Sequence, residues 1–403
     1  MHIDATAYWQ AGVAMRTGRT LYAATPVAAL DKAYLYPPAF AAAFAPLTLL
    51  SPVWGYAVWM ALLGLCAIAL ATTCAELAGL RREQTEARRT ALALALAAGI
   101  APVFDNFAEG QVNLLVTWLS AVALLNAERG RDRRAAFALA AAVHVKLVPI
   151  VLAGAFVVWR RPKLLAWLAV ALVAVGCLPL AWRVGTLGAG AGLQAFAGDY
   201  ADFWGWILWP GASAHQVAGV PQLFAPNFSW NATLSRLFVD GTALSPFPAL
   251  AERRGALLVA LPPSAVHAVS TGLGLALLTV ALWLCHRTRD DASRRVAAAG
   301  LVLLAAALAA PSCWQHHLVV LAVAGAGLWR GLAERRRRDQ RVAWTVAILP
   351  LVATLTIPFG AALVAGGVAA DWYRDLREYG VATAAAFNAF VVVAVVTATP
   401  RRA

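Results

Sequence analysis

The feature that most constrains this fold is a series of apolar runs separated by short polar gaps, with basic residues in every second gap. An apolar run of about 18 residues or more is long enough for a helix to cross a bilayer. Lysine and arginine collect on the cytoplasmic side of membrane proteins. The alternation therefore predicts an all-α, polytopic transmembrane protein.

The composition supports this prediction and argues against other classes. The 403 residues are 61% hydrophobic and 13% charged, whereas a soluble domain carries about 25% charged residues. The net charge of +13 would suit a nucleic-acid partner, but the basic residues flank the spans as short clusters, so we expect contact with a lipid bilayer and none with nucleic acid. The sequence contains no Walker loop, HExxH motif or Cys/His zinc spacing, so we expect no cofactor. A divalent metal on the paired carboxylates Asp105 and Glu109 stays an alternative that no motif indicates.

The apolar runs and basic clusters together predict a topology. Residues 135–159 are long enough for a single span, but that span would put Arg160, Arg161 and Lys163 on the opposite side from Arg129–Arg134. They are therefore interpreted as a re-entrant hairpin with Pro149 near its turn, and each arm of about a dozen residues, about 18 Å of helix, is too short to cross. This choice puts 23 of the 33 Lys and Arg residues on the cytoplasmic side of a multi-pass plasma-membrane protein that forms one domain, 1–403. The predicted spans are residues 52–74, 90–104, 112–127, 164–182, 264–285, 296–311, 317–333, 342–369 and 380–398.

The predicted outer side carries most of the polar residues that could do chemistry. It holds an N-terminal segment, 1–50, a short polar loop, 105–111, and a long loop, 183–263. The aromatic residues of the long loop suit either the membrane interface or a carbohydrate platform. Asp199 and Asp202 in that loop either bind sugar hydroxyls or lie on a solvated surface.

Several residues stand out by type and place. Asp4 precedes a predicted amphipathic helix, 5–17, and is either a helix cap or a functional carboxylate. Lys146 lies in the apolar hairpin, where a cation costs about 2.5–3.5 kcal/mol on insertion scales, so it calls for a phosphate ligand or a structural carboxylate. His316 and His317 end a polar gap, and either imidazole can donate a hydrogen bond to a phosphate oxygen.

Six motifs follow one another in an order that is similar to the order of motifs in a known family. The series resembles the actinobacterial polyprenol-phosphate-sugar glycosyltransferases of the GT-C superfamily, in glycosyltransferase family 87, a branch with mannosyltransferases and some arabinofuranosyltransferases. Family members usually carry a transmembrane helix before the catalytic aspartate, whereas three residues precede Asp4 in this sequence. The motifs are Asp4-x-x-x-Tyr8, Gly18-x-x-Leu-Tyr22 with Tyr36-Pro-Pro, Glu109-Gly-Gln111-x-Asn113, His144-x-Lys146-x-x-Pro149, Asn227-Phe-Ser followed by Arg236, and Trp314-Gln-His316-His317.

The resemblance implies a fold and a reaction. The fold is a GT-C-type helical bundle, and the reaction transfers a glycosyl residue, preferentially mannose, from a polyprenyl-phosphate sugar to a glycolipid or lipoglycan acceptor on the outer face, in cell-envelope biosynthesis. The alternatives are an arabinofuranosyltransferase of the same family and a lipid-linked-sugar flippase. The polar residues gather on the outer side and do not follow a path across the bilayer, which favours the enzyme.

The resemblance also assigns roles within a monomeric enzyme. Asp4 is expected to act as the general base of an inverting reaction, with His316 and His317 as further catalytic residues. Lys146 and Arg236 are expected to bind the donor phosphate. The residues expected to bind substrate are Tyr8, Tyr36, Glu109, Gln111, Asn113, Asn227 and Trp314.

Overall fold

A computed structural model describes most of the chain as helices. Within the described residues no strand occurs, so the all-α prediction is confirmed for them. They fall into two compact units: one from Met1–Leu70, Asp105–Ile150 and Pro162–Val220, and the other from Ala71–Phe104, Val151–Arg161 and Pro221–Ala403. The described residues are 3–22, 34–80, 101–208, 227–239, 258–310, 313–333 and 381–398.

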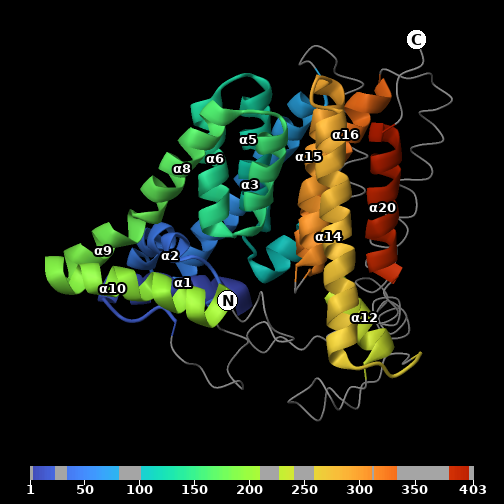
Figure 1. Ribbon diagram of the computed structural model, residues 1–403. Helices are drawn as coiled ribbons and strands as arrows, with labels where there is room; N and C mark the ends of the chain where they lie inside the picture. Colours follow the sequence, from blue (N-terminus) through green and yellow to red (C-terminus); the bar gives the residue numbers. More distant parts are fainter. Residues whose placement is uncertain are drawn as a thin grey trace. The chain divides into compact units, whose positions relative to one another are not determined.

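The first unit packs its N-terminal helices against an aromatic core. Helices α5 and α6 form a hairpin, and α8 lies beside α6 (Figure 1). The Tyr8 ring packs edge-on against Phe40 and Trp59, with ring centroids 5.1 and 6.0 Å away. Its helices are α1 (Ile3–Thr17), α2 (Pro38–Phe44), most of α3 (Pro52–Leu77), α5 (Asn113–Glu128), α6 (Asp132–Val145), α8 (Pro162–Gly176), α9 (Leu178–Leu187) and α10 (Ala189–Asp202).

The second unit is built around α15, which packs against α14, α16 and α20 (Figure 1). Small residues let α15 and α16 approach closely, as in other membrane helix pairs. A Cβ added to Gly327 would lie 2.2 Å from the backbone nitrogen of Ala297, and one added to Gly300 would lie 2.5 Å from the Ala324 Cα. Its helices are α7 (Leu152–Val158), α12 (Trp230–Phe238), α14 (Pro263–Arg287), α15 (Ala292–Ala309), α16 (Leu321–Ala333) and α20 (Val381–Ala398).

Three helices among the described residues are long and apolar enough to cross a membrane. They are Pro52–Leu77, Pro162–Leu187 and Pro263–Arg287, and they match three predicted spans. Large apolar side chains on them, such as Leu65 and Val173, are exposed on the protein surface, as lipid-facing residues are. The other described spans are helical but do not reach this combination of length and apolarity. Residues 342–369 and most of 90–104 lie outside the described residues.

Two segments that were predicted as outer loops contain helices in the structure, so the loop prediction is wrong for them. Residues 101–109 are helical, so the polar stretch 105–111 is a helix end followed by a turn at Gly110. The long loop 183–263 contains the end of α9, all of α10 and α12. The physical reason is that polar side chains do not prevent a helix where the apolar residues still share one face. Gly188, with φ of +81°, separates α9 from α10.

The predicted break in residues 135–159 is present. Helix α6 ends at Val145, Lys146 takes an extended conformation, and a short 3₁₀ turn over Val148–Val151 leads into α7. Pro149 lies in that turn, where its fixed φ and missing N–H are tolerated. Two short helices therefore replace one long span, while the re-entrant path of the hairpin stays a prediction.

Candidate active site

A tight turn at Gly110 brings the end of one helix against the start of α1. Gly110 has a φ of +66°, and a Cβ added there would lie 2.9 Å from the Ala5 Cβ. The Trp59 indole donates a hydrogen bond of 2.8 Å to the Gly110 carbonyl oxygen. Glycine is needed here both for the left-handed backbone and for the close approach. The turn places Gln111 next to Asp4.

Gln111 is the centre of the polar network in the first unit. Its Nε2 donates to Oδ2 of Asp4, a half-buried carboxylate in the first turn of α1. Its Oε1 lies 3.2 Å from the hydroxyls of Tyr8 and Tyr36 and from Nδ2 of Asn113. An amide oxygen can only accept hydrogen bonds, so these donors fix the orientation of the amide. The Nε2 group is thereby held toward the carboxylate.

Tyr8 and Tyr36 support this network from inside the protein. Both are buried, and their hydroxyls lie 2.9 Å apart. Burial raises the pKa of Tyr8 well above its ordinary value, and the nearby Tyr36 and Asp4 raise it further. Burial, with a further contribution from Asp4, also raises the pKa of Tyr36. Both hydroxyls therefore stay protonated, and the two side chains contact Gln111, while their predicted contact with substrate stays a prediction.

Lys146 extends the network to the end of α6. Its Nζ donates to Oδ1 of Asn113 at 3.0 Å and lies 6.0 Å above the centre of the Tyr36 ring. The sequence predicted a phosphate or a carboxylate beside this cation, and the structure gives it an amide oxygen and an aromatic face. A hydrogen-bonded series thus runs from Lys146 through Asn113 and Gln111 to Asp4. His144, two residues earlier, is bound to the Leu172 carbonyl oxygen at 2.8 Å.

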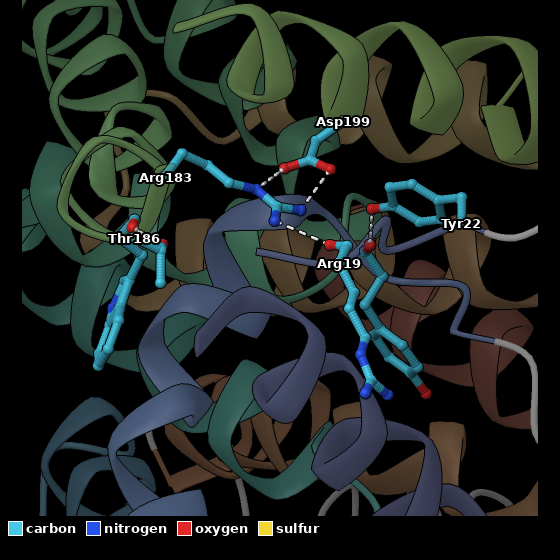
Figure 2. Close-up of polar contacts among 7 residues, drawn as sticks. Arg19, Tyr22, Arg183, Thr186 and Asp199 are labelled. Carbon is cyan, nitrogen blue, oxygen red and sulfur yellow. Dashed lines mark hydrogen bonds and ion pairs between the residues drawn. The ribbon is translucent and has the colours of Figure 1, made fainter. Parts of the chain in front are cut away.

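A buried ion pair, which the sequence did not predict, ties α9 and α10 to the N-terminal segment (Figure 2). Arg183 donates from Nε and Nη2 to the two carboxylate oxygens of Asp199 at 2.8 and 2.7 Å, and from Nη1 to the Arg19 carbonyl oxygen at 2.8 Å. Both side chains are buried. Asp199 is therefore not on a solvated surface, and its predicted contact with a sugar stays a prediction. Nearby, Tyr22 donates to the Tyr36 carbonyl oxygen at 2.5 Å.

The second unit brings two of the sequence motifs together at Asn227. Its Oδ1 accepts from the backbone N–H of Ser229 at 3.1 Å and of Cys313 at 2.9 Å. The Phe228 N–H donates to the Cys313 carbonyl oxygen. The Ser229 hydroxyl in turn caps α12 by accepting from the Ala232 N–H. Asn227 thus cross-links the start of α12 to the segment that carries the two histidines, and its predicted contact with substrate stays a prediction.

Arg236 lies in the same cluster and is buried. Its Nη1 donates to the Asn227 carbonyl oxygen at 2.8 Å and its Nη2 to the Thr233 hydroxyl at 3.3 Å. The Thr233 hydroxyl is also 2.9 Å from that of Thr383 on α20. Through these contacts Arg236 helps to hold α12 in position. Its binding of a donor phosphate stays a prediction.

Trp314 contacts both His316 and His317 and helps to fix their orientations. The Trp314 backbone N–H donates to Nδ1 of His317 at 3.0 Å, so the proton of the neutral imidazole is on Nε2. His316 is buried and stacks on the Trp314 ring, with centroids 6.3 Å apart and planes at 7°. The rings of His316 and His317 meet edge to face at 4.8 Å. His317, the half-buried member, is the better placed to donate to a ligand.

The described residues contain few side chains that are grouped as metal ligands. No group of three or more His, Cys, Asp or Glu side chains among them is placed to hold an ion.

Glu109 is half-buried at the end of the helix that precedes Gly110. Its predicted role in binding substrate stays a prediction.

A membrane protein with a carboxylate held in place by a buried network has the kind of site that acid–base transfer chemistry uses. The model of glycosyltransferase family 87 matches residues 34–311, more than two thirds of the chain. The chain therefore belongs to glycosyltransferase family 87 and is a glycosyltransferase. Asp4, Tyr8 and the Trp314–His317 segment lie outside the matched residues. No curated protein and no solved structure matches the chain.

Proposed function

We propose that the protein transfers mannose from a polyprenyl-phosphate donor to a hydroxyl of a glycolipid or lipoglycan on the outer face of the membrane. Membership in family 87 supplies the class of reaction. The sequence has no nucleotide-binding motif, which favours a lipid-linked donor. The observation that carries the proposal is the hydrogen bond from Gln111 to Asp4, in a network that ends at Lys146.

In the proposed reaction Asp4 accepts the proton of the acceptor hydroxyl. The hydroxyl oxygen attacks the anomeric carbon, and the bond from that carbon to the phosphate oxygen breaks. The phosphate leaves with the electron pair, and attack from the opposite side inverts the anomeric configuration. Gln111 holds Oδ2 of Asp4, and we assign Oδ1 to the acceptor hydroxyl. General-base catalysis of this kind contributes about 10²–10⁴-fold to a rate.

The leaving phosphate gains negative charge, which cations or hydrogen-bond donors must stabilise. Lys146 is the cation that we assign to it, because the amide of Asn113 and the ring of Tyr36 hold its Nζ at the end of the network that begins at Asp4. Preorganised donors of this kind stabilise developing charge in a transition state. For His316 and His317 the proposal is a hydrogen bond to phosphate, with His317 favoured because its Nε2 carries the proton. Arg236 stays a candidate for the same role.

The proposal is tested by transfer of radiolabelled mannose from polyprenyl-phosphate-mannose, in membranes that express the full chain. The expected result is transfer by the wild type, a loss of about 10²–10⁴-fold in Asp4→Asn, and full activity in Gln194→Leu. Gln194 is the control because it lies at an exposed position of α10.

Other outcomes would overturn parts of the proposal. Transfer from polyprenyl-phosphate-arabinofuranose alone would replace mannose with arabinofuranose and keep Asp4. Equal transfer by wild type and Asp4→Asn would remove Asp4 as the base. Movement of a lipid-linked sugar across vesicles without transfer to any acceptor would favour the flippase.

A further inference from the structure

A basic pocket of about 390 Å³ lies in the second unit, where α14 ends and α15 begins. Three arginines and one aspartate line it, a net charge of +2 with the histidine neutral. None of these residues belongs to the network around Asp4 or to the cluster around Asn227. The lining residues are His286, Arg287, Arg289, Asp290, Arg294 and Ala398.

The three arginines are held to different degrees. Arg294 is fixed, since its Nε donates to Oδ2 of Asp291 at 2.7 Å and its Nη1 to the Thr397 carbonyl oxygen at 3.2 Å. The Arg287 guanidinium lies 5.3 Å above the ring of Trp283. Arg289 pairs with Asp290 at 3.2 Å, but their side chains are 37% and 89% exposed, and such surface pairs are weak. Arg289 can therefore exchange this partner for a stronger anion.

The surroundings place this pocket at the edge of a bilayer. Helix α14 is one of the three helices long and apolar enough to span a membrane. Trp283 lies one turn before its end and is 49% exposed, as is typical of tryptophans at the headgroup level. Leu275, two turns further back, is also exposed. An apolar surface thus leads along α14 directly to the arginines.

We propose that this pocket binds the phosphate group of an anionic phospholipid. Arginine suits phosphate because its planar guanidinium donates two parallel hydrogen bonds. The exposed face of Trp283 accommodates the adjoining glycerol and acyl chains, which a free phosphate ion lacks. Basic pockets between membrane helices bind headgroups in this way on the cytoplasmic side, the side on which the charge pattern predicts these arginines to lie.

The experiment is lipid titration of the purified full-length chain, with bound lipids counted by native mass spectrometry. The probes are dioleoyl-phosphatidylglycerol, dioleoyl-phosphatidylcholine and inorganic phosphate. We expect one phosphatidylglycerol to bind in preference to phosphatidylcholine, and its apparent Kd to rise by about tenfold or more in Arg287→Gln/Arg289→Gln, the scale set by a lost charge-assisted hydrogen bond. Arg133→Gln is the matched control, because Arg133 also lies 5.3 Å above an exposed tryptophan ring, that of Trp167, and does not line the pocket.

Each other outcome contradicts the proposal. An equal loss of binding in Arg133→Gln would mean diffuse attraction to basic surfaces. Inorganic phosphate that displaces phosphatidylglycerol at equal concentration would mean a small-anion site. If the double variant does not fold, Arg289→Gln alone must weaken phosphatidylglycerol binding, since its side chain is partly exposed and its ion pair is weak; unchanged binding in that variant would overturn the assignment.

Discussion

Gln111 donates a hydrogen bond to the carboxylate of Asp4, although the two residues lie 107 positions apart in the chain. The oxygen of this amide lies within hydrogen-bond distance of the Tyr8 and Tyr36 hydroxyls and of Nδ2 of Asn113. Because the Asn113 N–H group can only donate, it orients the Gln111 amide with its own N–H group toward the carboxylate. The network therefore sets both the position and the hydrogen bonding of the proposed base.

Replacing Gln111 tests whether this network serves the reaction. A hydrogen bond to a charged group is worth about 1.5–3 kcal/mol, so in Gln111→Leu we expect kcat for mannosyl transfer to fall roughly 10- to 100-fold with little change in KM. Gln111→Glu should also move the acid limb of the pH–rate profile to higher pH, because a second negative charge makes ionisation of Asp4 harder. Gln194→Leu, at an exposed position of α10, is the control. An unchanged kcat in Gln111→Leu would exclude Gln111 from positioning the base.

Gly110 and Gly130 form a matched pair for testing the turn beside Asp4. Both have a left-handed backbone, with φ of +66° and +69°, so alanine should cost about 1–2 kcal/mol of backbone strain at either site. Only at Gly110 would the new methyl group meet Ala5, on α1. We expect both variants to lower the melting temperature, and only Gly110→Ala to reduce the transfer rate. Equal rates in the two variants would show that the position of α1 does not matter for catalysis.

The ion pair between Arg183 and Asp199 should make a large contribution to stability. Asp199→Asn leaves a buried guanidinium without its counter-charge, which costs about 3–5 kcal/mol. Asp290→Asn removes the exposed partner of Arg289 and should cost less than about 1 kcal/mol. Chemical unfolding of both variants in detergent measures the difference. A small effect of Asp199→Asn would mean that the charge of Asp199 contributes little to holding α9 and α10 together.

The contact between α15 and α16 provides a test of packing. In Gly327→Ala the new methyl group would overlap the backbone of Ala297, and such overpacking costs about 1–3 kcal/mol. Gly325, on the same helix, has no atom within 4 Å of an added Cβ, so Gly325→Ala should leave the stability unchanged or slightly raised. Thermal unfolding in detergent compares the two. Equal melting temperatures would contradict the close approach of the two helices.

Much of the fold could be predicted from the lengths of the apolar runs. The helices over 52–77, 113–128 and 263–287 match predicted spans to within a few residues, because burial in lipid demands long apolar segments. A break near Pro149 was also predicted, because one long span would put the basic residues at its two ends on opposite sides of the membrane. The helices within 183–263 were not predicted, because short amphipathic segments between aromatic residues also suit a loop.

The site was only partly predictable for a related reason. The resemblance to family 87 indicated Asp4, Gln111 and Lys146, but residue types alone do not show that the three are linked through Asn113. The pairing of Arg183 with Asp199 was missed because a charged residue at the end of a span or within a loop is ordinarily exposed. A glycine between two short apolar segments, as at Gly188, was the one signal that could have predicted the α9–α10 hairpin and so brought the two charges together.

The cross-link at Asn227 has a consequence for how ligands act on the second unit. One side-chain oxygen binds both the start of α12 and the segment leading to Trp314 and His317, so neither can shift without breaking a bond to the other. A molecule that binds and shifts the Asn227–Val239 segment would therefore also shift the segment that carries His317. If the two are coupled in this way, thermodynamic reciprocity requires a ligand held by His317 to change the affinity of the Asn227–Val239 segment for its own ligand by the same factor.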